Sequence, residues 1–273
     1  MTSRLERYSG AVLLLGFAAL TLLPFLSILS ASLQESGEPV SGLRWPSSPH
    51  WENYAKAWST GGFASLVGSS AFVGAVVVPV SVLLAVMAGY ALAVLRPAGA
   101  NAILAFFLLG LTLPVEAAVI PLYYNMRSVG LVNTHWALIL PLIGLFMPFG
   151  VFWMRAAFAA TPRSLVEAAQ LDGATNWQIL WRVVFPTVRP AVATLVLLYF
   201  MWSWNQFLLA LILIQDPARR TAPAGLGRFI QEHGMNVPLL SAGTVIIITP
   251  VVLVYLLTQR HFVRGMLEGA LKG

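Results

Sequence analysis

Long apolar segments separated by shorter polar segments dominate the pattern of this chain. A helix of about 20 apolar residues is long enough to cross a hydrocarbon core about 30 Å thick. Four of the six longest apolar runs contain no Asp, Glu, Lys, Arg or His. The pattern predicts an all-α membrane protein with six transmembrane helices, and six crossings place both termini on the same side. The runs cover residues 11–33, 66–95, 102–122, 134–154, 190–214 and 241–258.

Two of the polar segments are expected to be external loops. Residues 34–65 predict an extended loop followed by a short amphipathic helix, because aromatic residues such as Trp51 and Trp58 favour the membrane interface. Residues 215–240 predict a second loop, in which prolines and glycines break any continuous helix. Two further segments are an internal loop, 161–190, and a cytoplasmic tail, 259–273. The whole chain, 1–273, is predicted to be a single transmembrane domain.

Composition supports the membrane class. Hydrophobic residues make up 58% of the chain and charged residues 10%, with a mean hydropathy of +0.80. A soluble domain has about 25% charged residues. The chain has no cysteine, which excludes disulfides, thiolate catalysis and cysteine-ligated metals, and we predict no metal site. The net charge of +6 indicates topology and attraction to the lipid bilayer, and no nucleic acid partner is expected.

The distribution of basic residues predicts the orientation. With both termini inside, ten basic residues fall on the cytoplasmic side and six outside, which favours the N-in and C-in topology. The first apolar run is longer than the hydrophobic core of a cleaved signal peptide, about 7–15 residues, so we expect a retained helix. The inner set is Arg4, Arg7, Arg96, Arg155, Arg163, Arg182, Arg189, Arg260, Arg264 and Lys272. The outer set is Arg44, Lys56, Arg127, Arg219, Arg220 and Arg228.

The internal loop predicts two short helices between the fourth and fifth apolar runs. Ser164 and Glu167 have the spacing of a capping box, in which each side chain satisfies a free backbone N–H of the first turn. Gly173 is placed to end that helix in a left-handed conformation. Residues 175–185 carry apolar side chains at helical spacing. Two prolines, Pro186 and Pro190, then redirect the chain into the fifth run.

This loop resembles a known family motif. Its pattern is similar to the EAA loop of the permease subunits of binding-protein-dependent ABC importers. The family usually has Ile and Leu before the proline, and here Val183 and Phe185 take those places, a mild departure. The matching residues are Glu167, Ala168, Ala169, Gly173 and Pro186.

Segments elsewhere narrow the resemblance to carbohydrate importers, and in particular to the smaller permease of the maltose transporter. One departure is Gly68-Ser69-Ser70, where such permeases commonly carry an Asn-Ser pair. The resemblance implies a multi-pass permease of a bacterial or archaeal cell membrane that imports a mono-, di- or oligosaccharide by alternating access. The alternative cargo is a sugar-like phosphate ester, such as a glycerophosphate compound. The segments are 88–99, 113–141, 202–213, 221–229 and 259–273.

The resemblance also implies partners. A coupling helix between spans four and five would dock on an ATPase, with Glu167 meeting a basic residue, Ala168 and Ala169 allowing close packing, and Gly173 giving the turn. Alternatively, Glu167 only caps its own helix. The chain has no G-x-x-x-x-G-K-[ST] phosphate loop, so ATP and Mg would be used by partner subunits, and no cofactor is expected on this chain.

The implied complex contains two ATP-binding subunits, a second and different permease, and an external solute-binding protein. Within the loop 215–240, four residues are expected to reach into the binding protein. The tail 259–273 would lie between the ATPase subunits, or would anchor the chain to the membrane through its basic side chains. The four loop residues are Pro223, Gly225, Leu226 and Gly227.

Glu116 is the one carboxylate within an apolar run. It is expected either to line a wet pathway or to bond freed backbone groups near the outer interface. A lone acid without H-E-x-x-H or G-x-S-x-G argues against a membrane enzyme, and the lack of paired charges argues against an ion-driven transporter. A polar and aromatic patch also suits a sugar pathway, or else structural packing. The patch is Trp202, Trp204, Asn205 and Gln206.

Overall fold

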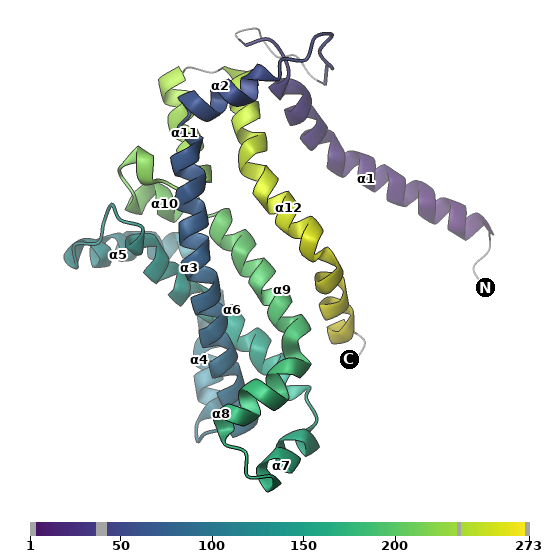
Figure 1. The fold of residues 1–273 in the computed structure, drawn as a ribbon, viewed down its shortest axis with the longest axis vertical. Coiled ribbons are helices and arrows are strands. Elements are labelled where there is room, and N and C mark those ends of the chain that lie inside the picture. The colour runs from purple at the N-terminus through teal and green to yellow at the C-terminus, as the bar shows by residue number, and fades with distance from the viewer. Residues whose placement is uncertain (1–3, 37–42, 234–235, 271–273) are drawn as a thin grey trace. The chain divides into compact units, whose positions relative to one another are not determined.

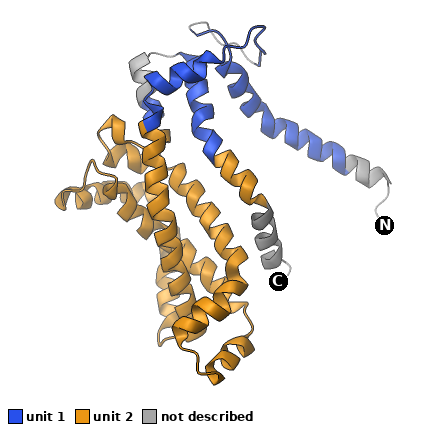
Figure 2. Cartoon of the chain, in the orientation of Figure 1, with its two compact units in different colours: residues 1–64, 225–250 blue, residues 65–224, 251–273 orange. Residues whose placement is uncertain are grey.

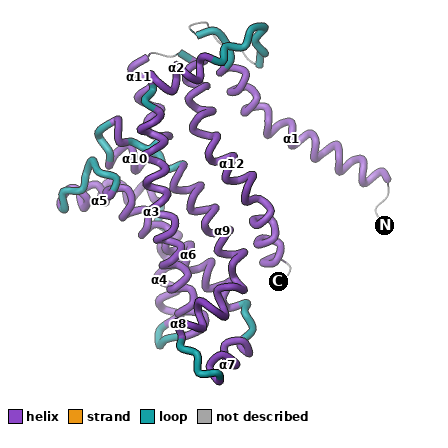
Figure 3. The backbone as a smooth tube through the Cα atoms, in the orientation of Figure 1, coloured by secondary structure: helices purple, strands orange, loops and turns teal. Residues whose placement is uncertain are grey.

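The structure is a computed structural model that describes residues 4–36, 43–233 and 236–270. Every regular element within these ranges is a helix (Figures 1 and 3). Two of the elements, η1 and η2, are π-turns, and η3 is a 3-10 turn. In chain order the helical elements are α1 (Arg4–Ser32), α2 (Glu52–Thr60), α3 (Phe63–Tyr90), η1 (Ala91–Leu95), α4 (Ala100–Thr112), α5 (Val115–Ser128), α6 (Trp136–Ala159), α7 (Arg163–Leu171), α8 (Asn176–Gln178), η2 (Ile179–Val184), α9 (Phe185–Trp204), α10 (Leu208–Leu213), η3 (Pro217–Arg219), α11 (Ala222–His233) and α12 (Val237–Ala270).

The chain divides into two compact units (Figure 2). Unit 1 comprises residues 1–64 and 225–250, and unit 2 comprises residues 65–224 and 251–273. The prediction of a single domain over the chain stays a prediction. Of the predicted tail 259–273, the backbone as far as residue 270 belongs to α12, and its basic side chains lie outside the described residues.

In unit 1, α2 ties down the end of α1. The buried side chain of Asn53 donates to the carbonyls of Ser32 (3.0 Å) and Gln34 (2.8 Å), which the end of α1 leaves without helical partners. The Tyr54 hydroxyl also contacts the Ser32 hydroxyl at 2.7 Å. The short helix predicted within residues 34–65 is therefore confirmed as α2.

In unit 2, α6 forms the centre of the core and packs against α4 and α9. A Cβ at Gly89 would lie 2.6 Å from the Cβ of Met154, so this glycine permits close approach of α3 and α6. The buried hydroxyl of Tyr199 donates to the carbonyl of Phe146 at 2.6 Å and fills the space that a Cβ at Gly150 would need. The core is thus fixed by shape as well as by apolar character.

Within the described residues, five helices are long and apolar enough to span a membrane. A sixth crossing is possible if the bent pair α4 and α5 counts as one span. The prediction of a helical membrane protein is confirmed, whereas the number of spans and the N-in, C-in orientation remain predictions. The five are Gly10–Ser32, Phe63–Leu95, Trp136–Ala159, Asn176–Trp204 and Val237–Gln259.

Two predicted runs do not form single helices. The run 102–122 is broken between α4 and α5, which meet at a bend of 99°. Pro114 explains the break, because a proline pushes the residue before it into extended backbone, and Leu113 has ψ 123°. The run 190–214 is interrupted after Trp204, and α10 begins at Leu208, where Gln206 accepts a hydrogen bond from the N–H of Leu209 (3.4 Å).

The prediction that prolines and glycines prevent a helix within 215–240 is wrong. Residues 222–233 form α11, which contains Pro223, Gly225 and Gly227. Pro223 lies in the first turn, where a helix needs no donor from it. Ala222 and Ala224 are fully buried, and this packing outweighs the helix-breaking tendency of each glycine, about 1 kcal/mol. Residues 234–235 of this predicted loop lie outside the described residues.

Candidate coupling site

The helix α7 and the segment α8–η2 lie together at one end of unit 2 (Figure 1). Ala169 is buried, and Val166 packs against the hydrophobic core that also contains Ile179 and Leu180 of η2. The helix α7 thus packs on η2, and η2 continues into α9 within the candidate membrane span Asn176–Trp204.

The predicted capping box at the start of α7 is wrong. The N-cap is Pro162, the helix begins at Arg163, and no side chain caps it. Ser164 therefore lies inside the first turn and cannot take the cap position. A helix readily starts just after a proline, whose ring fixes φ but provides no N–H. Glu167 is consequently free of the capping role that was its alternative assignment.

The end of α7 is formed as predicted. Gly173 has φ +78°, a left-handed conformation that L side chains rarely adopt. Its N–H donates to the carbonyl of Gln170 (3.0 Å), and the N–H of Ala174 donates to the carbonyl of Ala169 (3.0 Å). This pair of bonds is a Schellman motif, which satisfies carbonyls at the end of a helix.

The second predicted helix, 175–185, is confirmed, but it does not end at the prolines. Thr175 and Gln178 form the capping box that starts it, and helical structure then runs from Asn176 to Trp204. The π-turn η2 ends at Val184, and Pro186 is the second residue of α9; such a local irregularity occurs with proline in bent helices. The helix is therefore not interrupted at Pro186 or Pro190.

An apolar strip is exposed on the outer face of α7. Leu165 is 42% exposed and Leu171 is 89% exposed, with the exposed Ala168 between them. Residues three apart lie on one side of a helix, so these side chains form one continuous surface. Ala169 faces inward, so only one of the two alanines of the motif is exposed. We name Leu165, Ala168 and Leu171 the α7 strip.

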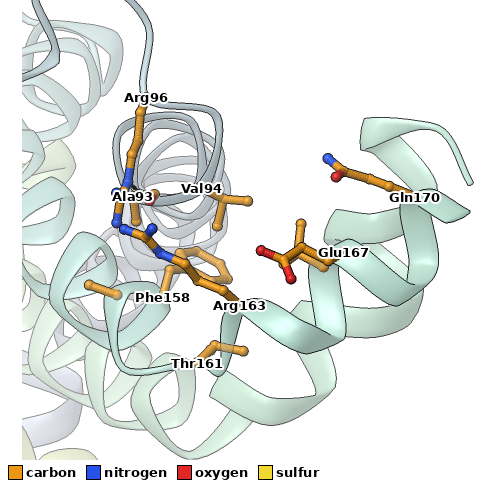
Figure 4. Close-up of a pocket in the computed structure, with 10 residues that line it drawn as sticks. Ala93, Val94, Arg96, Phe158, Thr161, Arg163, Glu167 and Gln170 are labelled. Atoms are coloured by element: carbon orange, nitrogen blue, oxygen red, sulfur yellow. Dashed lines mark hydrogen bonds between the residues drawn. The ribbon is translucent and has the colours of Figure 1, made fainter.

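Glu167 points into a cavity of about 210 Å³ (Figure 4). Arg96 and Arg163 line the same cavity, and their guanidinium groups extend toward each other in this view. Among the described residues, Glu167 has no ion pair or side-chain hydrogen bond. The cavity is therefore lined by one carboxylate and two guanidinium groups that form no ion pair among the described residues, and Arg96 Nε donates to the carbonyl of Ala93 (2.9 Å). The other lining residues are Ala93, Val94, Phe158, Ala159, Thr161, Val166 and Gln170.

Glu116 lies in the first turn of α5, directly after the 99° bend. Its side chain is exposed, and it makes no hydrogen bond or ion pair within the described part of the chain. A negative charge is favourable at a helix N-terminus, by about 0.3–1 kcal/mol. The expected bonds to freed backbone groups are not found, so the structure gives no support to that alternative.

The predicted polar and aromatic patch divides into separate environments. Trp202 packs in an aromatic cluster, with its ring centroid 5.0 Å from that of Phe149 and 5.8 Å from that of Phe146. Trp204 is buried, Gln206 accepts from the N–H of Leu209 in the first turn of α10, and Asn205 is exposed at the end of α9. Trp202, which is 40% exposed, and Asn205 are the two members whose side chains are open to a solute.

A hydrogen-bonded network that the sequence did not predict fixes the start of α11. The buried Ser70 hydroxyl accepts from the N–H of Ala222 at 2.8 Å. His135 contacts the Ser69 hydroxyl (3.0 Å) and the carbonyl of Arg219 (3.1 Å). In the sequence, the signal for this network was the polar pair Ser69 and Ser70 inside the apolar run 66–95. Of the predicted binding-protein residues, Pro223, Leu226 and Gly227 are half-buried and Gly225 is buried.

Comparison with known proteins identifies the family. Residues 81–268 match the model of the binding-protein-dependent transport system inner membrane component. The chain belongs to this family. It is a permease of the cell membrane, crossing it several times, and the carbohydrate-importer permeases that the sequence resembles are its close relatives.

Full-length relatives support the assignment. The arabinooligosaccharides transport permease AraQ of Halalkalibacterium halodurans is 33% identical, over 96% of each chain. The trehalose transport permease SugB of Mycobacterium tuberculosis is 34% identical, over 96% of this chain and 95% of the relative. A crystallised bacterial ABC transporter involved in import of the acidic polysaccharide alginate has a chain with TM-score 0.82 and 26% identity, covering 96% of this permease and 99% of that chain.

Proposed function

We propose that this permease is the transmembrane subunit of an ATP-driven importer of a carbohydrate. The observation that carries the proposal is the near full-length similarity to permeases named for arabinooligosaccharides and trehalose, together with the similarity to a chain of the alginate importer. A cargo of saccharides is common to all three. A sugar-like phosphate ester, the alternative cargo, has less support because none of these three relatives is named for one.

The α7 strip is proposed to dock on an ATP-binding partner subunit. An exposed apolar surface beside charged groups is typical of a protein interface. Ala168 lets the partner approach the backbone closely, while Leu165 and Leu171 supply apolar area on either side. Glu167, which caps no helix and forms no ion pair in the described part of the chain, is available to a basic residue of the partner at the edge of this surface.

Movement of the docked helix would reach the membrane through two contacts. The first is the packing of α7 on η2, which continues into α9. The second is the hydrogen bond from the Tyr90 hydroxyl to the carbonyl of Asn176 (3.2 Å), which links α3 to α8. A push on α7 is thereby shared by α3 and α9. We infer that this sharing converts ATP-driven closure of the partner subunits into alternating access.

The other proposed partners are a second, different permease, a second ATP-binding subunit and an external solute-binding protein. The family description names dependence on a binding protein. We propose that the surface around Pro223, Leu226 and Gly227 contacts that protein, and that Glu116 and Trp202 face the solute pathway. This chain would not hydrolyse ATP itself, and the partner subunits would use ATP and Mg.

The assembled complex, purified with its partner subunits and binding protein, provides the test. ATPase stimulation is measured with arabinooligosaccharides, trehalose, alginate oligosaccharides and glycerol 3-phosphate. We expect at least one saccharide to stimulate the complex and glycerol 3-phosphate to have no effect. Stimulation by the phosphate ester alone would reject the carbohydrate assignment. The variant Glu167→Ala serves as the uncoupled control, because it leaves the binding protein and its cargo unchanged.

A further inference from the structure

Three arginines gather where α3, α4, α6 and α7 come together in unit 2. Arg96 follows η1 in a left-handed conformation (φ +50°), Arg155 lies near the end of α6, and Arg163 begins α7. Two cavities adjoin at this point and share Ala93, Arg96 and Ala159 in their linings. The smaller contains Glu167. The larger, about 520 Å³, contains Arg96, Arg155 and Asn101, and no acidic residue.

Glu167 is the one carboxylate that lines either of these two cavities, and it lies in the smaller one with Arg96 and Arg163. None of the three arginines forms an ion pair in the described part of the chain, and the one side-chain bond among them runs from Arg96 Nε to the carbonyl of Ala93 (2.9 Å). Two like charges around one cavity repel each other unless an anion neutralises them. The planar fork of a guanidinium matches two oxygens of a phosphate. The larger cavity is thus suited to a phosphate-bearing anion.

The surroundings of the cavity indicate a lipid as the source of that phosphate. Arg96 comes directly after the apolar helix Phe63–Leu95, and Arg155 lies near the end of the apolar helix Trp136–Ala159. The ends of such helices lie at the level of the lipid headgroups. From the cavity, α4 leads away with exposed apolar side chains, Phe106 (72% exposed) and Leu109 (64%) among them. A phosphate in the cavity would therefore have its acyl chains along an apolar surface.

We propose that the cavity of Arg96 and Arg155 binds the phosphate group of an anionic phospholipid, and that this lipid adjusts coupling to the ATPase. Arg96 also lines the cavity of Glu167, so a bound phosphate lowers the positive potential beside that carboxylate. The regulatory part rests on the proposed docking of α7, whereas the binding part does not. Lipid binding and ATPase stimulation are therefore measured separately.

Native mass spectrometry of the purified full complex measures binding of phosphatidylglycerol, with phosphatidylcholine as the zwitterionic comparison. The variant Arg96→Gln/Arg155→Gln is compared with Arg182→Gln/Arg189→Gln, whose arginines are exposed and line neither cavity. Because each of these two arginines is proposed to bond directly to the lipid phosphate, we expect about fivefold weaker phosphatidylglycerol binding for each one lost, and about thirtyfold for both. The second variant is expected to bind as the unaltered complex does.

Several results would reject the proposal. Equal binding of the two lipids, or equal loss in the two variants, would show that the cavity does not select a lipid phosphate. Displacement of the lipid by millimolar inorganic phosphate would assign the cavity to a soluble anion. Loss of the ATPase subunits with lipid binding unchanged would assign these arginines to a protein interface. If the double variant does not fold, Arg155→Lys replaces it, because it keeps the charge and removes the fork.

Binding that is confirmed while ATPase stimulation stays independent of phosphatidylglycerol would reject the regulatory part and leave the lipid site in place. Failure of the saccharide panel with lipid binding intact would instead reject the proposed cargo.

Discussion

Replacing Leu171 by serine removes most of the apolar area of the α7 strip without disturbing the core. The side chain is 89% exposed, so this chain gains little stability from it, and we expect the free energy of unfolding to change by less than about 0.5 kcal/mol. On docking, nearly all of that side chain is available for burial. Full burial of a leucine stabilises a complex by about 1.5–3 kcal/mol. A loss of about 2 kcal/mol weakens binding of the ATPase subunit about thirtyfold.

The assay is titration of the purified ATPase subunit onto the permease complex, with the dissociation constant and the stimulated ATPase rate measured on the same preparations. Leu171→Met is the matched control, because it keeps an apolar side chain of similar volume and should retain most of the affinity. Thermal unfolding of both variants checks the fold. A dissociation constant for Leu171→Ser within twofold of the unaltered complex would contradict the assignment of this strip to the interface.

Three further substitutions separate the remaining inferences. Gly173→Val should uncouple the ATPase, because a non-glycine residue in this left-handed position costs about 1–2 kcal/mol. Gly173→Asn should keep much of the activity, because asparagine adopts this conformation more readily. Equal stimulated ATPase rates in the two variants would contradict the role of the turn. Ser70→Ala leaves the buried N–H of Ala222 without its partner, so we expect the free energy of unfolding to fall by about 1–3 kcal/mol. An unchanged midpoint of thermal unfolding would show that another group accepts this hydrogen bond. Glu116→Gln should change uptake of the saccharide while assembly, followed by gel filtration, stays intact; unaltered uptake across the panel would remove Glu116 from the pathway.

The boundaries of helices were predictable where a local chemical signal acts alone. Gly173 stops α7 because its backbone freedom is a property of the residue itself. Ser164 and Glu167 have an equally clear local signal, yet no cap forms, because the helix already starts after Pro162. Pro114 restricts Leu113 to extended backbone, which is a local signal for the break between α4 and α5. The long apolar run around it nevertheless led to the prediction of one continuous helix.

The candidate site was only partly visible in the sequence. The spacing of Glu167, Gly173 and Pro186 located the loop, since a motif is a pattern in one stretch of chain. The exposure of Leu171 and the burial of Ala169 could not be read there, because they depend on η2 lying beneath α7. The link between Ser70 and Ala222 joins residues 152 apart in the chain, and no local pattern predicts such a bond.

The sequence by itself determined that this chain is a helical membrane permease with a polar segment between its fourth and fifth apolar runs. The length and composition of an apolar segment determine that it is stable as a helix in the lipid bilayer. This can be decided without knowing which other segments it packs against. Only the tertiary structure decided which face of α7 is open, that Glu167 points into a cavity, and that Arg96 and Arg155 share another. Those features arise when separate helices pack together, because packing determines which side chains are buried, which stay exposed and which charges are brought close.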